Sequence, residues 1–355
     1  MPPVSNYSIN IIAAHAMMEG TNDTILEVKD LRTYFYTEDG VVKAVDGLSY
    51  HVNNGECVGL VGESACGKSV SAMSVLRLIP YPPGVIVGGQ ILFKGEDLLQ
   101  ATEERMRHIR GNRIAMIFQE PTSSLNPVLT VGRQISESLE LHRGMDKKTA
   151  LAESVKLLKL VGIPDPERRI KDHPYQFSGG MQQRIMIAMA LSCSPELIIA
   201  DEPTTSLDVT VQAQILEIIA DLRSKLHTAV MIITHNLGVV ARYVDRVNVM
   251  YAGALVETGP TEAIYAEPQH PYTLGLLASV PRLDGPGQGS SRKRNLRVIK
   301  GLPPNLARLP KGCPFAPRCD YAMARCREEK PVLERAGEDR FRACFYDAAE
   351  LKRTV

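Results

Sequence analysis

Residues 57–70 read Cys-Val-Gly-Leu-Val-Gly-Glu-Ser-Ala-Cys-Gly-Lys-Ser-Val, and this stretch decides the fold. Its first five residues are apolar or small and predict a short buried strand. Residues 62–69 match the phosphate-loop pattern G-x-x-x-x-G-K-S, and residues 70–78 predict that a helix follows. The sequence therefore places a phosphate loop between a strand end and a helix N-terminus.

A loop in that position presents backbone N–H groups and the positive end of a helix dipole to an anion. Gly62 and Gly67 would let the backbone approach phosphate closely, and Lys68 would contact the β- and γ-phosphates. The Ser69 hydroxyl would bind Mg²⁺. The predicted nucleotide-binding residues of this loop are Gly62, Ser64, Ala65, Cys66, Gly67, Lys68, Ser69 and Val70.

The bulk composition narrows the class of protein. The 355 residues suit one large or two ordinary domains, and 44% hydrophobic residues are enough for a sizeable core. A net charge of +1 gives no reason to expect nucleic acid as the main partner. No apolar run approaches the ~18 residues of a transmembrane helix, so we expect a cytoplasmic protein. Residues 1–24 are expected to form a disordered extension, or else Met1 is an upstream start codon ahead of the true start at Met18.

Apolar runs and helical periodicities along the chain predict an α/β fold. Residues 25–36 are predicted as an edge strand that turns at Glu38-Asp39-Gly40 into a returning strand, and residues 80–89 as a turn-rich break. Further strands are predicted at residues 90–93, 113–118, 197–202 and 229–234, a hairpin at 246–257, and helices at 98–110, 131–160 (a pair), 182–192 and 211–226.

Polar residues stand where several of these strands end. Gln119, Asp201, Glu202 and His235 each follow or close an apolar strand. Beside a phosphate loop, Asp201 would hold Mg²⁺ and Glu202 would act as general base toward the attacking water. Gln119 could reach the Mg²⁺ or its water and His235 the γ-phosphate, although from the residues alone both could equally be structural.

Two further segments carry weaker signals. An aromatic residue on the first strand, Phe35 or its neighbour Tyr34, could stack on an adenine or could be an ordinary strand residue. Ser178, Gly179 and Gly180 precede a predicted helix and offer either a second anion site or a simple N-cap.

These motifs occur together and in one order, so the sequence resembles the ATP-binding subunits of ABC transporters over residues 25–285. In that family the fold is a P-loop ABC-type nucleotide-binding domain: a mixed sheet core with an antiparallel β subdomain and a helical subdomain, here about residues 121–180. The resemblance implies Glu202 and His235 as catalytic, Phe35 as the adenine-stacking residue with Tyr34 or Tyr36 as rivals, and Mg²⁺ held by Ser69, Gln119 and Asp201. It also implies nucleotide contacts from Gln119 and from a signature and D-loop that include Ser178, Gly179, Gly180, Gln182 and Asp208.

Residues 118–127, Phe-Gln-Glu-Pro-Thr-Ser-Ser-Leu-Asn-Pro, narrow the resemblance to the dipeptide/oligopeptide-uptake branch. His270-Pro271-Tyr272-Thr273 and the Cys-Pro-x-x-x-Arg-Cys pattern of residues 313–319 are similar to the same branch. The implied activity is ATP hydrolysis that powers peptide uptake. Nickel, glutathione or a sugar remain alternative solutes, and a soluble ABC-type ATPase not coupled to transport and a non-hydrolysing regulatory subunit remain alternative functions.

The resemblance also implies partners and a location. Two ATPase subunits pair head to tail in this family, and here the second is commonly a different chain. The pair would act with two transmembrane permease subunits and, indirectly, an extracytoplasmic solute-binding protein. The expected location is the cytoplasmic face of the bacterial inner membrane.

Four cysteines gather near the C-terminus, separated by five, six and seventeen residues: Cys313, Cys319, Cys326 and Cys344. Four thiolates suit a [4Fe–4S] cluster or zinc, and free or disulfide-bonded thiols remain possible. The resemblance implies the cluster. We expect a linker at residues 286–300 and a Cys-rich domain at 301–355, in which Pro314, Pro317, Arg318 and Arg325 wrap around an anionic cluster.

Overall fold

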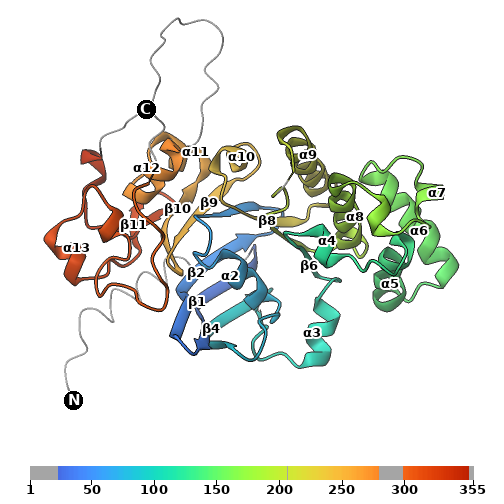
Figure 1. Cartoon of the computed structure of the whole chain (residues 1–355), viewed down its shortest axis with the longest axis horizontal. Helices are drawn as coiled ribbons and strands as arrows, with labels where there is room; N and C mark the ends of the chain where they lie inside the picture. The colour runs from blue at the N-terminus through green and yellow to red at the C-terminus, as the bar shows by residue number, and fades with distance from the viewer. Residues whose placement is uncertain (1–22, 206, 280–298, 352–355) are drawn as a thin grey trace, which may run out of the picture.

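The computed structural model describes residues 23–205, 207–279 and 299–351, and Figure 1 shows their arrangement. The predicted extension at residues 1–22, most of the predicted linker and Ser206 lie outside these ranges. The described strands form two sheets, a four-stranded one and an eight-stranded one. The predicted α/β fold with a mixed core sheet and an antiparallel β subdomain is confirmed.

The eight-stranded sheet is the core, because it places the phosphate loop. Its strands run in the order β11-β12-β10-β9-β3-β8-β7-β6, and β9, β3, β8, β7 and β6 are mutually parallel. All residues of β3, β7 and β8 are buried, as expected of parallel strands covered on both faces. The strand bounds are β3 Cys57–Val61, β6 Ile114–Ile117, β7 Leu197–Asp201, β8 Ala229–Thr234, β9 Arg246–Tyr251, β10 Ala254–Pro260, β11 Glu334–Gly337 and β12 Arg340–Arg342.

The four-stranded sheet is antiparallel and has the order β2-β1-β4-β5. Its strands are β1 Thr24–Thr37, β2 Gly40–Asn53, β4 Gly84–Phe93 and β5 Glu96–Asp97. Two predictions are wrong here. The first strand is not an edge strand, because β1 pairs with both β2 and β4, and residues 84–89 are not a break but the first half of β4. Its glycines are accommodated beside β1, where a Cβ at Gly89 would lie 2.6 Å from the backbone of residues 29–31.

The helices divide between the core and a separate helical subdomain. Helix α2 (Lys68–Val75) follows the phosphate loop, and α5 (Val131–Arg143) and α6 (Lys147–Leu160) form the predicted pair that packs on α8 (Gly179–Leu191). The Thr130 hydroxyl caps α5 by accepting from Arg133 N–H at 3.3 Å. The remaining helices are α3 Glu103–Ile109, α4 Pro121–Ser124, α7 Pro166–Arg169, α9 Val209–Leu226, α10 Leu237–Val240, α11 Thr261–Ala266, α12 Pro271–Ala278 and α13 Ala324–Glu328. None of the helices in the described ranges is long and apolar enough to cross a membrane.

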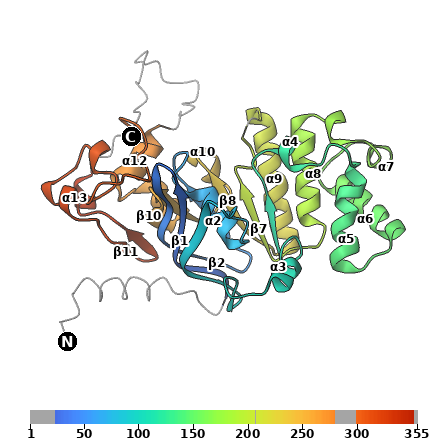
Figure 2. The same ribbon diagram turned by 60° about the horizontal axis from the view of Figure 1, so that its bottom comes forward.

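We call residues 299–351, which include α13 and β11, the C-terminal segment. In both views this segment lies at one end of the molecule and the helical subdomain at the other (Figures 1 and 2). The segment is not separate from the core sheet, because β12 pairs with β10 through Glu257–Arg342 and Thr258–Phe341. A domain boundary at residue 301 stays a prediction.

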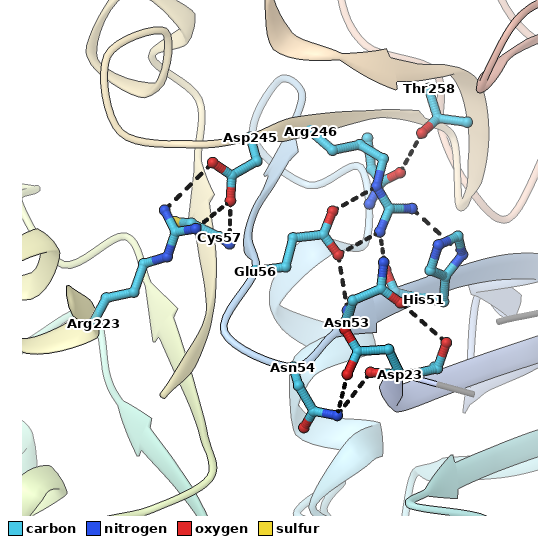
Figure 3. A network of polar contacts seen from close by, with 12 residues as sticks. Asp23, His51, Asn53, Asn54, Glu56, Cys57, Arg223, Asp245, Arg246 and Thr258 are labelled. Atoms are coloured by element: carbon cyan, nitrogen blue, oxygen red, sulfur yellow. Dashed lines mark hydrogen bonds and ion pairs between the residues drawn. The ribbon is translucent and has the colours of Figure 1, made fainter. Parts of the chain in front are cut away.

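A polar network joins the two sheets at the amino ends of the core strands (Figure 3). Arg246 of β9 donates to both carboxylate oxygens of Glu56 at 2.9 and 2.7 Å and to the carbonyl of His51 in β2 at 3.0 Å. Arg223 of α9 pairs with Asp245, which also accepts from Cys57 N–H at 2.9 Å. These contacts fix α9, β3 and β9 relative to the antiparallel sheet.

Candidate nucleotide-hydrolysis site

The phosphate loop crosses from β3 to α2 at the carboxyl end of the core sheet. It has almost no room for side chains at its two glycines: a Cβ would lie 2.3 Å from the Met250 carbonyl at Gly62 and 2.0 Å from the Ala44 carbonyl at Gly67. The buried Lys68 ammonium donates to the carbonyls of Gly62 and Glu63, both at 2.9 Å. The loop therefore already holds its lysine at the place where phosphate is expected.

The other residues of the loop differ in how far they are exposed to solvent. Ser64 and Ala65 are exposed at the tip, Cys66 and Gly67 are buried, and Ser69 and Val70 are half-buried on the first turn of α2. The tip residues are therefore the part of the loop that is most open to an incoming anion.

Ser69, on the first turn of α2, meets Asp201 at the end of β7. The Ser69 hydroxyl donates to an oxygen of the Asp201 carboxylate at 3.0 Å. Burial raises the pKa of Asp201 above its ordinary value, and the Ser69 hydrogen bond only partly opposes this shift. A hydroxyl and a buried carboxylate are oxygen donors of the kind that suits Mg²⁺.

Glu202 follows Asp201 and is the centre of a second group. Its carboxylate accepts from Gln119 Nε2 at 3.0 Å and from the Thr205 hydroxyl at 2.8 Å, and His235 Nδ1 lies 3.2 Å from its other oxygen. The Glu202 backbone has φ +44°, an uncommon conformation for a side chain other than glycine. The structure thus brings together residues that follow β6, β7 and β8. Sequence analysis predicted Gln119 as a Mg²⁺ ligand. In the structure its amide contacts Glu202, and the Mg²⁺ role stays a prediction.

Thr205 was missed by sequence reasoning. It lies three residues after Glu202 in a turn whose Thr205 N–H donates to the Glu202 carbonyl. A hydroxyl residue in this turn was visible in the sequence, but the return of its side chain to the carboxylate was not.

The predicted signature residues lie apart from this site. Ser178, at the N-cap of α8, makes no side-chain cap, and Gly180 faces Val211, where a Cβ would lie 2.8 Å from a Val211 methyl carbon. Gly179 faces Leu207, and Gln182 is buried and donates to the carbonyls of Pro174 and Phe177. Asp208 caps α9 by accepting from Val211 N–H at 3.0 Å. In the described ranges no hydrogen bond joins α8 or this turn to the phosphate loop.

The three aromatic candidates on β1 point in different directions. The Tyr34 hydroxyl donates to Asp46 at 2.6 Å, and Lys43 lies over its ring. Phe35 faces Gly84, where a Cβ would lie 2.8 Å from its ring, and Tyr36 is 53% exposed. Tyr34 has a polar partner already, and so Phe35 and Tyr36 are freer to take a base.

The C-terminal segment also reaches the phosphate loop. Arg318 forms an ion pair with Glu63, the second residue of the loop, at 2.6 Å. Tyr272 accepts from the Glu63 N–H at 2.8 Å through its hydroxyl. Both residues belong to motifs that sequence analysis singled out without finding this contact.

The expectation that the arginines near the cysteines wrap around an anionic cluster is wrong in this structure. Arg318 turns toward Glu63, and Arg325 stacks on Phe345 at 4.1 Å and pairs with Glu329. Carboxylates of the protein itself satisfy these two charges.

The four C-terminal cysteines line one small, mainly apolar cavity together with His270 and Phe315. In the part of the chain that the structure describes, no group of three or more His, Cys, Asp or Glu side chains converges closely enough to hold a metal ion. The structure therefore brings the cysteines around one space but forms no ready single-ion site there.

The fold and this arrangement define a class of protein, the ATP-binding cassette of ABC transporters. The ABC transporter family model matches residues 45–205. A dimeric structure of the ATP-binding cassette MJ0796 bound to ADP and Pi has the same fold, with a TM-score of 0.60 and 24% identity, and covers 66% of this chain and 98% of that one.

Within that class, the chain belongs to the family of ATP-binding proteins of oligopeptide and dipeptide transporters. The family model "Oligopeptide/dipeptide transporter, C-terminal region" matches residues 256–326. The chain is 50% identical to the oligopeptide transport ATP-binding protein OppD of Bacillus subtilis, over 89% of this chain and 87% of that one. It is 51% identical to the dipeptide transport ATP-binding protein DppD of the same organism, over 87% and 90%. It is also 51% identical to a probable peptide ABC transporter ATP-binding protein of Sinorhizobium fredii, over 91% and 95%.

Proposed function

We propose that the chain hydrolyses ATP and that this hydrolysis drives the import of oligopeptides or dipeptides. One observation carries the proposal: Lys68, Ser69, Asp201 and Glu202 meet at one edge of the core sheet, in a chain about half identical to peptide-transport ATP-binding proteins. Lys68 and the loop N–H groups suit a triphosphate, and Glu202 suits the activation of water.

In this proposal the phosphate loop positions the triphosphate at the N-terminus of α2. Ser69 and Asp201 would hold Mg²⁺, with Gln119 as the third predicted ligand, and the ion supplies neutralisation of phosphate charge when bound. Glu202 orients the attacking water and accepts its proton. Thr205 and His235 fix the Glu202 carboxylate, and His235, which is 51% exposed at its side chain, faces the open side of the site.

The active form is proposed to be a head-to-tail pair of ATPase subunits. The signature residues Ser178, Gly179, Gly180 and Gln182 lie away from the phosphate loop of their own chain, so a second chain would have to present its own signature here. The solved structure of the MJ0796 cassette is likewise dimeric, which supports a pair of subunits. We propose a second, different ATPase chain as partner, two permease subunits that hold the pair at the cytoplasmic face of the membrane, and a solute-binding protein that delivers the peptide.

The test is ATP hydrolysis by the full transporter, assembled with its permease subunits in proteoliposomes, with and without a mixture of dipeptides and oligopeptides. We expect hydrolysis to rise with peptide and to be lost in Glu202→Gln. Uptake of nickel, glutathione or a sugar instead of peptide would change the solute in this proposal but leave the proposed ATPase activity intact. Hydrolysis by the purified chain that is independent of the permease would contradict the coupling.

We also propose that Cys313, Cys319, Cys326 and Cys344 hold a [4Fe–4S] cluster. The four thiols line one cavity, and a cluster needs its ligands spread around several irons rather than converged on one ion. Iron and acid-labile sulfide analysis of anaerobically purified full-length protein tests it, with about four irons per chain expected for one cluster. One zinc per chain, or no metal with free thiols, would contradict it.

A further inference from the structure

Arg318 is fully occupied at the phosphate loop. Its guanidinium has five N–H donors, and five acceptors surround it. Two are the carboxylate oxygens of Glu63, at 2.6 and 2.9 Å. The others are the carbonyls of Lys300 and Gly301, at 2.8 and 3.3 Å, and the Tyr251 hydroxyl at 3.4 Å. The Arg318 side chain is 6% exposed, so this is a mostly desolvated, bidentate pair with a defined geometry.

Tyr272 holds the backbone of the same loop residue. Its hydroxyl accepts from Glu63 N–H at 2.8 Å, and its ring is buried against Tyr251 and Phe315, with ring centroids 4.6 and 5.3 Å away. The Glu63 carbonyl accepts from Lys68 Nζ at 2.9 Å. One residue therefore connects Arg318 and Tyr272 on one side to the phosphate-binding lysine on the other.

The chain before Arg318 encloses the same loop. Pro303, Pro304 and Leu306 line a small cavity with residues 63–66 of the loop and with Tyr251 and Ala252. The Leu306 carbonyl accepts from Lys43 N–H in β2 at 3.3 Å. The C-terminal segment thus contacts the phosphate loop through the Arg318–Glu63 pair and an apolar wall, and it is tied to the neighbouring strand β2 by a backbone hydrogen bond.

We propose that the C-terminal segment and α12 together form a positioning element for nucleotide, in which Arg318 of the segment and Tyr272 of α12 hold Glu63 so that the phosphate loop is preformed before nucleotide binds. A loop ordered in advance loses less conformational freedom on binding, which favours affinity. The contacts are made to the loop and not to the reacting atoms, so they act equally on the bound ground state and the transition state. Their loss raises KM and leaves kcat nearly unchanged.

This inference rests on the proposed ATPase activity but is tested independently of it by the binding of Mg–ADP to the purified full chain in calorimetry. For Arg318→Met and Tyr272→Phe we expect Mg–ADP affinity to fall and, in the assembled transporter, KM for ATP to rise, each by about tenfold, with kcat within about twofold. Glu63→Gln should weaken binding similarly. The double variant Arg318→Met with Glu63→Gln should bind Mg–ADP no more weakly than whichever single variant binds it more weakly. The reason is that the two residues act through one pair.

Arg325→Met is the matched control, since Arg325 lies in the same segment but pairs with Glu329 at the surface. It should leave the affinity and KM unchanged. A purely structural role predicts another pattern: lower melting temperatures for the Arg318 and Tyr272 variants with Mg–ADP affinity and KM as in the wild type. That pattern, or equal effects of Arg325→Met, would overturn the proposal. An absence of ATP hydrolysis in the wild-type transporter would remove the proposed function and leave the Mg–ADP result standing.

Discussion

Two polar clusters occupy opposite ends of the strands in the same parallel sheet. The amino-end cluster consists of Glu56, Arg246, Arg223 and Asp245, next to β3 and β9 (Figure 3). The carboxyl-end cluster consists of Ser69, Asp201, Glu202, Gln119 and His235. Both contain two acidic residues that are linked by hydrogen bonds to several elements of the fold, and they differ in what neutralises the charge.

At the amino end each carboxylate has an arginine. Burial alone would raise the pKa of Glu56, but the hydrogen bonds and charge of Arg246 outweigh it and hold the pKa below its ordinary value. At the carboxyl end, burial raises the pKa of Asp201 and its closest partner is the neutral Ser69 hydroxyl. A cluster in which each carboxylate is paired with an arginine stabilises a fold, whereas one whose carboxylates are held mainly by neutral donors is prepared for an external cation or ligand.

The largest expected effect separates the two clusters by activity. Glu202→Gln should lower ATP turnover of the assembled transporter by about 10²- to 10⁴-fold, the range for loss of a general base, because the amide cannot accept a proton from water. Its midpoint of urea unfolding should stay close to that of the wild type. Glu56→Gln is the matched control at the other end of the strands, and at a pH and temperature where it is folded its turnover should remain within a few-fold of the wild type.

Comparable losses of turnover in both variants would contradict the distinction between the clusters. So would full activity of Glu202→Gln, which would assign the proton transfer to a different residue.

Sequence reasoning found the carboxyl-end cluster because a single rule places its members. Residues that follow parallel strands meet at one edge of a sheet, and Gln119, Asp201 and His235 each follow an apolar run that is recognisable locally. The parallel strands β3, β6, β7 and β8, the α5–α6 pair and the β9–β10 hairpin were also predictable, because their apolar patterns are local. The nucleotide and magnesium roles of Gln119, Asp201 and His235 stay predictions.

Contacts set by partners far away in the chain were not predictable. Arg318 meets Glu63 across 255 positions and Tyr272 meets Glu63 across 209. The pairing of β1 on both sides likewise depends on β4, whose first half contains three glycines that locally indicate a break. A sequence motif marks that such residues matter, but only the fold shows what they contact.

The next effect in size concerns stability at the amino end. Glu56→Gln leaves the Arg246 guanidinium, which is 12% exposed, without its anion. Removal of one partner from a buried pair costs about 3–5 kcal/mol, and we expect about 2–4 kcal/mol here because the pair keeps slight solvent contact. The measurement is the free energy of unfolding in urea. The control is Glu329→Gln, which breaks a pair that is 60% and 44% exposed at its side chains and should cost less than about 0.5 kcal/mol. Equal losses in both variants would mean that the Glu56–Arg246 pair contributes no more to stability than an exposed surface pair.

The smallest effect is a dependence of stability on acid pH, which follows from the lowered pKa of Glu56 in the amino-end cluster. Because the pKa of Glu56 is lower in the folded state than in the unfolded chain, the unfolded state takes up the proton first as pH falls. The stabilisation by Glu56 is therefore complete above the unfolded value of about 4.3 and is lost as pH falls through the lower folded value. The difference in unfolding free energy between the wild type and Glu56→Gln should be constant from pH 7 down to about 5 and shrink below about 4.3.

Other carboxylates titrate in both proteins and cancel in this difference. A difference that stays constant to pH 3 would mean that Arg246 binds the protonated and ionised carboxyl equally, and that the amino-end cluster is held by shape and not by charge.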